Sequence, residues 1–153
     1  MLWGNAADIG KIFVLQKRAI RFIYGLKPRD SLRELFKSIN IMTVASQYIF
    51  DVLIFVKSNL HLYKTLSDVN SVVTRNRHKL CMNRFRLKKV RRSFVGQSVK
   101  LFNKLPVEAI NLPMPKFKSY IKNALMANAY YTISDYLNDK KPWTLPKTST
   151  SHT

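Results

Sequence analysis

Apolar side chains recur every three to four positions through the first third of the chain, which is the spacing of amphipathic helices. The first helix is expected to begin after Asp8, which can serve as its N-cap, and to end near Gly25, with Pro28 beyond it. Three cations on one side predict a basic outer face: Lys17, Arg18 and Arg21. The predicted buried face consists of Ile9, Ile12, Phe13, Ala19, Ile20 and Ile23.

A second and a third helix are predicted from similar signals. Ser31 and Glu34 have the spacing of a capping box, and the apolar stripe that follows is Leu32, Leu35, Phe36 and Ile39. Thr43 is expected to open the third helix, which runs to about Lys57 and is apolar on almost every side. Because such a helix is normally surrounded by others, we place it at the centre of the domain. Its main apolar face is Ala45, Tyr48, Ile49, Val52, Leu53 and Val56.

The helical period is lost over residues 66–92. The stretch 69–74 is β-branched and polar, and cations alternate with apolar residues from Arg84 to Lys88. Alternation over so few residues fits a short strand, and it fits an extended segment held on the surface equally well.

Helical spacing returns at Ser93 and lasts until Pro106, which cannot continue a helix. The apolar positions there are Phe94, Val95, Val99, Phe102 and Leu105. A proline-containing connector at 112–115 precedes a helix that begins near Lys116. Its inward positions are predicted to be Phe117, Tyr120, Ile121, Ala124 and Leu125, with Lys116, Lys118 and Lys122 outward.

A short helix at 134–138 is expected before a tail, 139–153, that is rich in Pro, Ser and Thr and is predicted to be disordered. The predicted fold is therefore mainly α. It is a single small helical domain, 1–138, of about five to six helices, with the extended basic segment 66–92 in its middle. With 153 residues and 46% hydrophobic content, such a domain can bury roughly two-thirds of its unfolded surface.

The excess of basic residues indicates what kind of partner this domain binds. The formal net charge is +19, and no acidic residue lies between Asp68 and Glu108, a stretch that holds eleven Lys and Arg. A field of one sign repels itself in a compact state, and a solvated face normally mixes signs. We therefore expect a polyanionic partner, and the phosphate backbone of RNA or DNA is the one that clustered Lys and Arg bind through counterion release.

The predicted nucleic-acid-binding residues are the cations of the first helix and of the basic segment: Lys17, Arg18, Arg21, Arg75, Arg77, Arg84, Arg86, Lys88, Lys89, Arg91 and Arg92. Two aromatic residues flank the densest part of this set. Phe85 could equally stack on unpaired bases or belong to the core, whereas for Phe94 the helical spacing favours the core. The run 86–92 is also compatible with a nuclear-import signal.

The sequence predicts no catalytic residue, cofactor or metal. It has no glycine-rich phosphate loop and no G-x-S-x-G motif. His78 and Cys81 have a zinc-like spacing, but a structural site needs four ligands and only His61 could be a third. Two acidic pairs, Asp30 with Glu34 and Asp135 with Asp139, are interpreted as solvated helix termini.

The sequence is expected to be that of a soluble intracellular protein of the nucleus or cytoplasm. Cys81 is the only cysteine, which fits a reducing compartment. The longest apolar run, 48–56, contains Asp51 and is far shorter than a bilayer span, and no cationic leader precedes an apolar run at the N-terminus.

Several stretches, taken in order, resemble one family. They are Trp3-Gly4-Asn5, then Leu15-Gln16-Lys17-Arg18-Ala19-Ile20-Arg21 with Gly25, then Thr74-Arg75-Asn76, then Leu101-Phe102-Asn103-Lys104-Leu105-Pro106, and finally Phe117-Lys118. This order resembles the region downstream of the polymerase domain in reverse transcriptases of non-LTR, LINE-type, jockey-like retrotransposons. The similarity covers about residues 2–137.

The resemblance implies a fragment of an RNA-directed DNA polymerase with a thumb-like, template-holding role. In that family the palm carboxylates, with a Tyr/Phe-x-Asp-Asp signature, lie upstream of the matching region. This sequence has no adjacent Asp-Asp pair, and it lacks the cysteine/histidine knuckle of some relatives. Because two-metal phosphoryl chemistry needs paired carboxylates, the chain is not expected to polymerise DNA by itself.

Two further interpretations compete with nucleic-acid binding. The chain could be a structural or interaction remnant whose helices packed on a polymerase domain, in which case exposed apolar patches would promote self-association. Membrane-surface binding through the basic first helix is disfavoured, because its apolar face is expected to be needed for the core.

Overall fold

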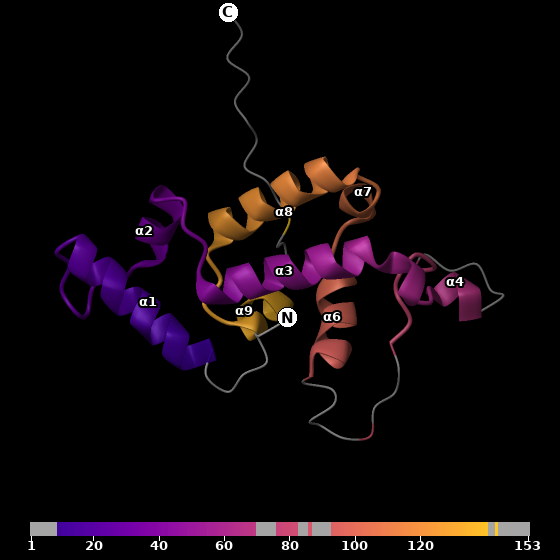
Figure 1. Ribbon diagram of the computed structural model, residues 1–153, viewed down its shortest axis with the longest axis horizontal. Helices are drawn as coiled ribbons and strands as arrows, with labels where there is room; N and C mark the ends of the chain where they lie inside the picture. The colour runs from indigo at the N-terminus through magenta and orange to yellow at the C-terminus, as the bar shows by residue number, and fades with distance from the viewer. Residues whose placement is uncertain (1–8, 70–75, 83–85, 87–92, 141–142, 144–153) are drawn as a thin grey trace, which may run out of the picture.

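The computed structural model describes residues 9–69, 76–82, 86, 93–140 and 143, which form a helical domain (Figure 1). Its elements in chain order are α1 (Ile9–Ile23), α2 (Arg33–Ser38), α3 (Val44–Ser58), the 3-10 turn η1 (Leu60–Leu62), α4 (Leu66–Val69), α6 (Phe94–Phe102), α7 (Val107–Ile110), α8 (Met114–Asn128) and α9 (Ile133–Asn138). The predicted mainly α fold is confirmed. In the described part of the chain, the one β-contact outside helices is an isolated antiparallel bridge between Thr65 and Leu80.

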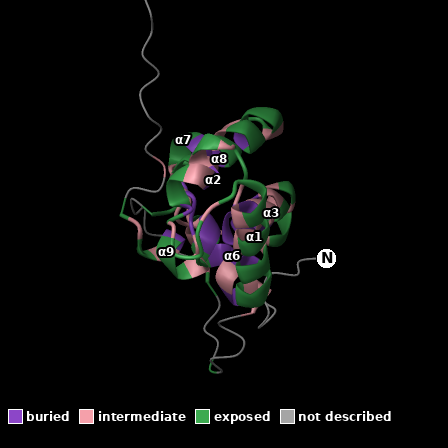
Figure 2. Ribbon diagram, turned by 90° about the vertical axis from the view of Figure 1, so that its left-hand side faces the viewer, coloured by how far each residue is buried: buried purple, intermediate pink, exposed green. Residues whose placement is uncertain are grey.

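Helix α3 is the centre of the domain, as its apolar sequence predicts. It packs against α1, α6, α8 and α9, and the residues of its main apolar face are buried, as the ribbon coloured by burial shows for the interior of the domain (Figure 2). Thr43 caps it, because its Oγ1 accepts a hydrogen bond from the Ser46 amide at 3.1 Å. The same hydroxyl donates to the carbonyl of Tyr130, so the start of α3 is tied to the end of α8.

The buried side chains form two clusters. The larger one joins α3, α6, α8 and α9 around Leu53, Phe102 and Phe117. The smaller one joins α1, α2 and the start of α3, and it consists of Phe13, Ile20, Leu32, Phe36, Val44 and Ala129. Helix α1 is therefore held at the edge of the domain by a small core of its own.

The buried face of α1 is narrower than predicted. Phe13 and Ile20 are buried, but Ile12 and Ala19 are exposed and Ile23 is 72% exposed. The prediction is wrong for these three because neighbours cover α1 on one side only. The middle of that side is taken by Gln16, whose Nε2 donates to the Met42 carbonyl at 2.9 Å and whose Oε1 accepts from the Val44 amide at 3.0 Å.

Gly25 ends α1 as predicted. Its φ is 61°, a left-handed conformation that glycine adopts without the steric cost of a Cβ. The Gly25 amide donates to the Phe22 carbonyl at 3.4 Å and the Leu26 amide to the Arg21 carbonyl at 2.9 Å. These two bonds are those of a Schellman motif, and Leu26 packs on the smaller core.

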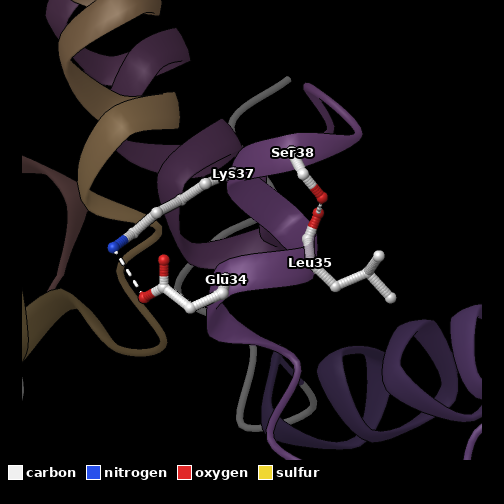
Figure 3. Close-up of polar contacts among 4 residues, drawn as sticks. All are labelled: Glu34, Leu35, Lys37 and Ser38. Atoms are coloured by element: carbon white, nitrogen blue, oxygen red, sulfur yellow. Dashed lines mark hydrogen bonds and ion pairs between the residues drawn. The ribbon is translucent and has the colours of Figure 1, made fainter.

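The predicted capping box of α2 is wrong. The N-cap is the buried Leu32, which makes no side-chain cap. Ser31 therefore precedes the N-cap, and Glu34 is the second residue of the helix, whereas a capping box needs the acidic residue at the third. Its carboxylate instead pairs with the Lys37 ammonium at 2.9 Å (Figure 3). The predicted apolar stripe is correct, since Leu32 and Phe36 are buried and Leu35 and Ile39 are half-buried.

Helix α6 ends at Phe102, and the residues up to Pro106 form a junction. The Asn103 side chain accepts from the Leu80 amide at 2.8 Å and donates to the Leu80 carbonyl at 2.9 Å. The Lys104 ammonium donates to two carbonyls at the end of α9, at 2.6 Å each. Pro106 is the N-cap of α7, a short helix that the sequence did not predict. Val95, one of the apolar positions of this predicted helix, is 56% exposed.

The prolines expected to form a connector belong instead to the start of α8. Pro113 is the N-cap and Pro115 lies in the first turn, where a missing amide hydrogen costs no hydrogen bond. The predicted inward and outward positions of α8 are confirmed: Phe117, Ile121, Ala124 and Leu125 are buried, Tyr120 is half-buried, and Lys116, Lys118 and Lys122 are exposed.

Contacts with the core continue past α9. Thr132 and Asp135 form a capping box at its start. Asp139 accepts from the Tyr130 hydroxyl at 2.5 Å, and the indole Nε1 of Trp143 donates to the Lys104 carbonyl at 2.9 Å. These contacts lie beyond residue 138, at which the helical domain is predicted to end. The remainder of the predicted tail, 141–142 and 144–153, lies outside the described residues.

Candidate nucleic-acid interface

The three predicted cations of α1 line one open cavity of about 580 Å³. It lies between the second half of α1 and the loop that follows. The described residues that line it include no carboxylate, and they are Val14, Lys17, Arg18, Arg21, Phe22, Gly25, Leu26 and Pro28. The left-handed turn at Gly25 directs the loop back along the helix, which creates this hollow. We call it the α1 cavity.

Lys17 is more than a surface charge. Its ammonium lies 4.7 Å from the centre of the Phe13 ring and 5.9 Å from that of Tyr131, and the residue is half-buried. A cation over an aromatic face is attracted by the negative face of the ring. The prediction that Lys17 lies opposite the apolar face is therefore wrong, because it packs against that face and still borders the α1 cavity.

Arg33 joins this cluster from α2 and was not predicted. Its guanidinium carbon lies 4.8 Å from the centre of the Tyr131 ring. Burial raises the pKa of Tyr131, and the positive charge of Arg33 opposes that rise. No local sequence signal identifies Arg33, because Tyr131 reaches α2 only through the packing of the chain after α8.

Arg21 ties α1 to its loop. Its Nη2 donates to the Asp30 carbonyl at 3.0 Å, while its buried Nε has no hydrogen-bond partner. The carboxylate of Asp30 accepts instead from the Lys27 amide at 2.9 Å. Asp30 therefore stabilises the loop after α1, and the prediction that it lies at the start of α2 is wrong. Arg21 lines the α1 cavity together with Lys17 and Arg18.

The exposed Arg18 completes the α1 group. In the basic segment, Arg77 and Arg86 are also exposed, and six predicted site residues lie outside the described part of the chain: Arg75, Arg84, Lys88, Lys89, Arg91 and Arg92. Phe85 lies outside it as well. Phe94 is half-buried and packs edge-on against Phe55, with ring centres 5.3 Å apart, as expected of a core residue.

Residues 76–82 of the basic segment are attached to the fold through their backbone. The Leu66 amide donates to the Lys79 carbonyl at 2.8 Å and the Cys81 amide to the Lys64 carbonyl at 2.7 Å, on either side of the Thr65–Leu80 bridge. Asn103 holds Leu80 from the other side. The predicted loss of the helical period from residue 66 is wrong for Leu66–Val69, which form α4. The alternation from Arg84 to Lys88, for which a short strand and an extended surface segment are both open, lies outside the described residues except for Arg86.

The two groups of cations lie near opposite ends of α3 (Figure 1). Gln16 attaches α1 to the start of α3. At the other end, residues 79–81 of the basic segment pair with residues 64–66, which follow the end of α3. A helix of 15 residues is about 22 Å long. The structure therefore brings Lys17, Arg18 and Arg21 together, but it does not place Arg77 beside them.

Among the described residues, no group of three or more His, Cys, Asp and Glu side chains could hold a metal ion. Of the acidic pairs, Asp135 caps the start of α9 as predicted, whereas Asp139 binds the Tyr130 hydroxyl at the end of that helix. None of the described helices is long and apolar enough to cross a membrane.

Comparisons with known proteins identify no family for the chain. No family model, no curated protein and no solved structure matches it.

Proposed function

We propose that this domain binds the backbone of RNA or DNA without sequence specificity. The observation that carries the proposal is the α1 cavity, whose described lining residues include three cations and no carboxylate. The exposed Arg77 and Arg86, in a stretch of sequence without any acidic residue, supply a second set of charges. Phosphates compensate such charges, and the counterions released from the nucleic acid drive binding.

We further propose that the domain is of the kind that follows the polymerase domain in non-LTR retrotransposon reverse transcriptases, where it would hold template and primer. The support is the ordered set of motifs together with what their residues do. Gln16 holds the start of α3, Gly25 ends α1, and Asn103 and Lys104 hold the basic segment and α9. Because these motif residues hold the elements of the fold together, proteins that share the motifs are expected to share this architecture.

The first prediction is a steep salt dependence of binding. If five or six cations meet phosphates, the slope of log affinity against log salt on duplex DNA should be about −4.5 to −5.5, at about 0.9 per phosphate. Fluorescence anisotropy with labelled duplexes of unrelated sequence, titrated over a range of NaCl, measures it. Affinity that differs strongly between sequences, or a slope near zero, would contradict the proposal.

The second prediction concerns catalysis. Purified protein given a primed template, nucleotides and Mg²⁺ or Mn²⁺ is expected to extend no primer, because the chain contains no adjacent pair of aspartates to hold two metal ions. A gel assay with a known polymerase as positive control measures this. Extension that persists through further purification would show that the carboxylates needed are supplied in another way.

A second candidate function is that of an interaction module. The observation that favours it is the outer face of α1, where Leu15 is 61% exposed and Ile23 is 72% exposed. Such a face suits a protein partner, such as a polymerase domain, or a second copy of the chain. Solution mass over a range of concentrations separates this function from the first, because a nucleic-acid-binding domain should remain monomeric without its ligand.

A further inference from the structure

The α1 cavity has an aromatic residue at its mouth. Phe22 is 91% exposed, more than any other large apolar side chain in the described part of the chain. A single exposed apolar residue is ordinary. Of the other exposed apolar residues of α1, Val14 also lines the cavity, whereas Ile12, Leu15 and Ile23 do not. Phe22 is the aromatic one that lies beside the cations.

The arrangement of cation and ring follows from helix geometry. Arg18 and Phe22 are four residues apart and therefore adjacent along one face of α1. Lys17 and Arg21 form the next row of the same surface, and Val14, Leu26 and Pro28 supply apolar lining. The cavity thus offers an aromatic face, an apolar wall and positive charge within one hollow. A nucleotide presents the matching groups, a flat base and a phosphate.

We propose that the α1 cavity binds one nucleotide of an unpaired strand, with its base stacked on the Phe22 ring and its phosphate against Arg18. This inference rests on the proposed nucleic-acid binding and names its preferred substrate as single-stranded. A base inside a duplex is covered above and below by its neighbours, so only an unpaired base can offer its face to Phe22. Stacking of this kind tolerates any base, because every base has a π-face.

A second copy of the chain is the poorer occupant of this surface. The chain carries a net charge of +19, and the charged side chains among the described lining residues are all cations, so two copies meeting here would bring like charges together. An apolar partner or an anionic bilayer would engage the whole exposed face of α1. It would therefore use Ile23 as well as Phe22.

The test compares Phe22→Ala with Ile23→Ala, a neighbouring exposed residue that does not line the cavity. Labelled oligo-dT and a duplex of equal length are titrated by fluorescence anisotropy. Phe22→Ala should weaken binding to oligo-dT by about 5- to 100-fold, the effect of losing one stacked base, and change duplex binding by less than about 2-fold. Ile23→Ala should bind both ligands like wild type, and Phe22→Trp should retain single-strand affinity.

Three outcomes would overturn the inference. Equal single-strand affinity for Phe22→Ala and wild type would show that no base stacks there. Equal losses in Phe22→Ala and Ile23→Ala would assign the face to an apolar partner or a membrane. Wild-type binding to duplex with no binding to oligo-dT would refute the inference alone, whereas failure to bind either ligand at low salt would refute the proposed function with it. Thermal melting of each variant confirms that the exposed substitutions leave the fold intact.

Discussion

Replacing Leu53 by alanine is expected to lower the free energy of unfolding by about 2–5 kcal/mol. Leu53 lies in the middle of α3 and is fully buried in the larger core, between helices that pack on α3 from several sides. Because the backbone there cannot collapse onto the space, the lost side chain leaves a cavity. Domains have a total stability of about 5–15 kcal/mol, so the variant could lose a large part of its folded population.

Urea denaturation followed by circular dichroism measures the effect. Val95→Ala is the matched control, since Val95 is an exposed aliphatic residue of the neighbouring α6 and its loss should change stability by no more than about 0.5 kcal/mol. A loss below about 0.5 kcal/mol for Leu53→Ala would show that the centre of α3 is not the core. Equal losses in both variants would point to an effect on the unfolded chain.

The elements that the sequence predicts well are those fixed by local chemistry. Gly25 ends α1 because the left-handed turn needs a residue without Cβ, and Thr43 caps α3 because its hydroxyl reaches the third amide. The apolar pattern of α3 identifies the central helix because α1, α6, α8 and α9 all pack on it. The capping box at Ser31 fails for a tertiary reason: burial of Leu32 fixes where α2 begins.

The candidate site depends more on contacts that are distant in sequence. Arg33 reaches the cations of α1 through Tyr131, a contact that spans almost a hundred residues and has no local signal. The exposed face of α1 is likewise unpredictable from periodicity, which counts Ile12 and Ile23 with Phe13 but cannot say how wide a strip the neighbours cover. Neither apolar periodicity nor charge assigns a structural role to Gln16 or Asn103. Each nevertheless bonds to both a backbone amide and a backbone carbonyl of a distant segment.

Not every cation of the acid-free stretch is available to bind phosphate. Lys104 belongs to this stretch, but its ammonium donates hydrogen bonds to carbonyls at the end of α9. Burial lowers the pKa of Lys104, and the nearby Asp139 opposes that shift. A cation at the negative end of a helix stabilises that helix. Lys104 is therefore a structural residue, and the number of cations available for phosphate is smaller than the sequence count.

A clean test of the binding surface must separate charge from folding. Lys17 packs on two aromatic rings and Arg21 holds the loop after α1, so replacing either one would disturb the fold as well as the charge. Arg18 is exposed and makes Arg18→Gln the suitable variant for the α1 cavity. For the basic segment, the suitable variant replaces Lys88, Lys89, Arg91 and Arg92 together with glutamine.

The four-fold variant is expected to weaken binding to all sequences alike and to reduce the salt slope by up to about three to four units, if each cation meets a phosphate. Arg18→Gln should reduce it by about one unit. Stability should change little in either case, and relief of repulsion within a chain of net charge +19 could raise it. Anisotropy titrations at several salt concentrations, with thermal melting alongside, measure both quantities.

The control is Lys118→Gln with Lys122→Gln, which removes two exposed cations from the outer face of α8. Its effect should be smaller than that of the four-fold variant, because a cation surrounded by few others attracts fewer phosphates to its vicinity. If the four-fold variant binds normally while Arg18→Gln does not, the basic segment is merely solvated and α1 alone is the site. If only the α8 variant loses affinity, the nucleic-acid interface is the outer face of α8, and neither α1 nor the basic segment forms it.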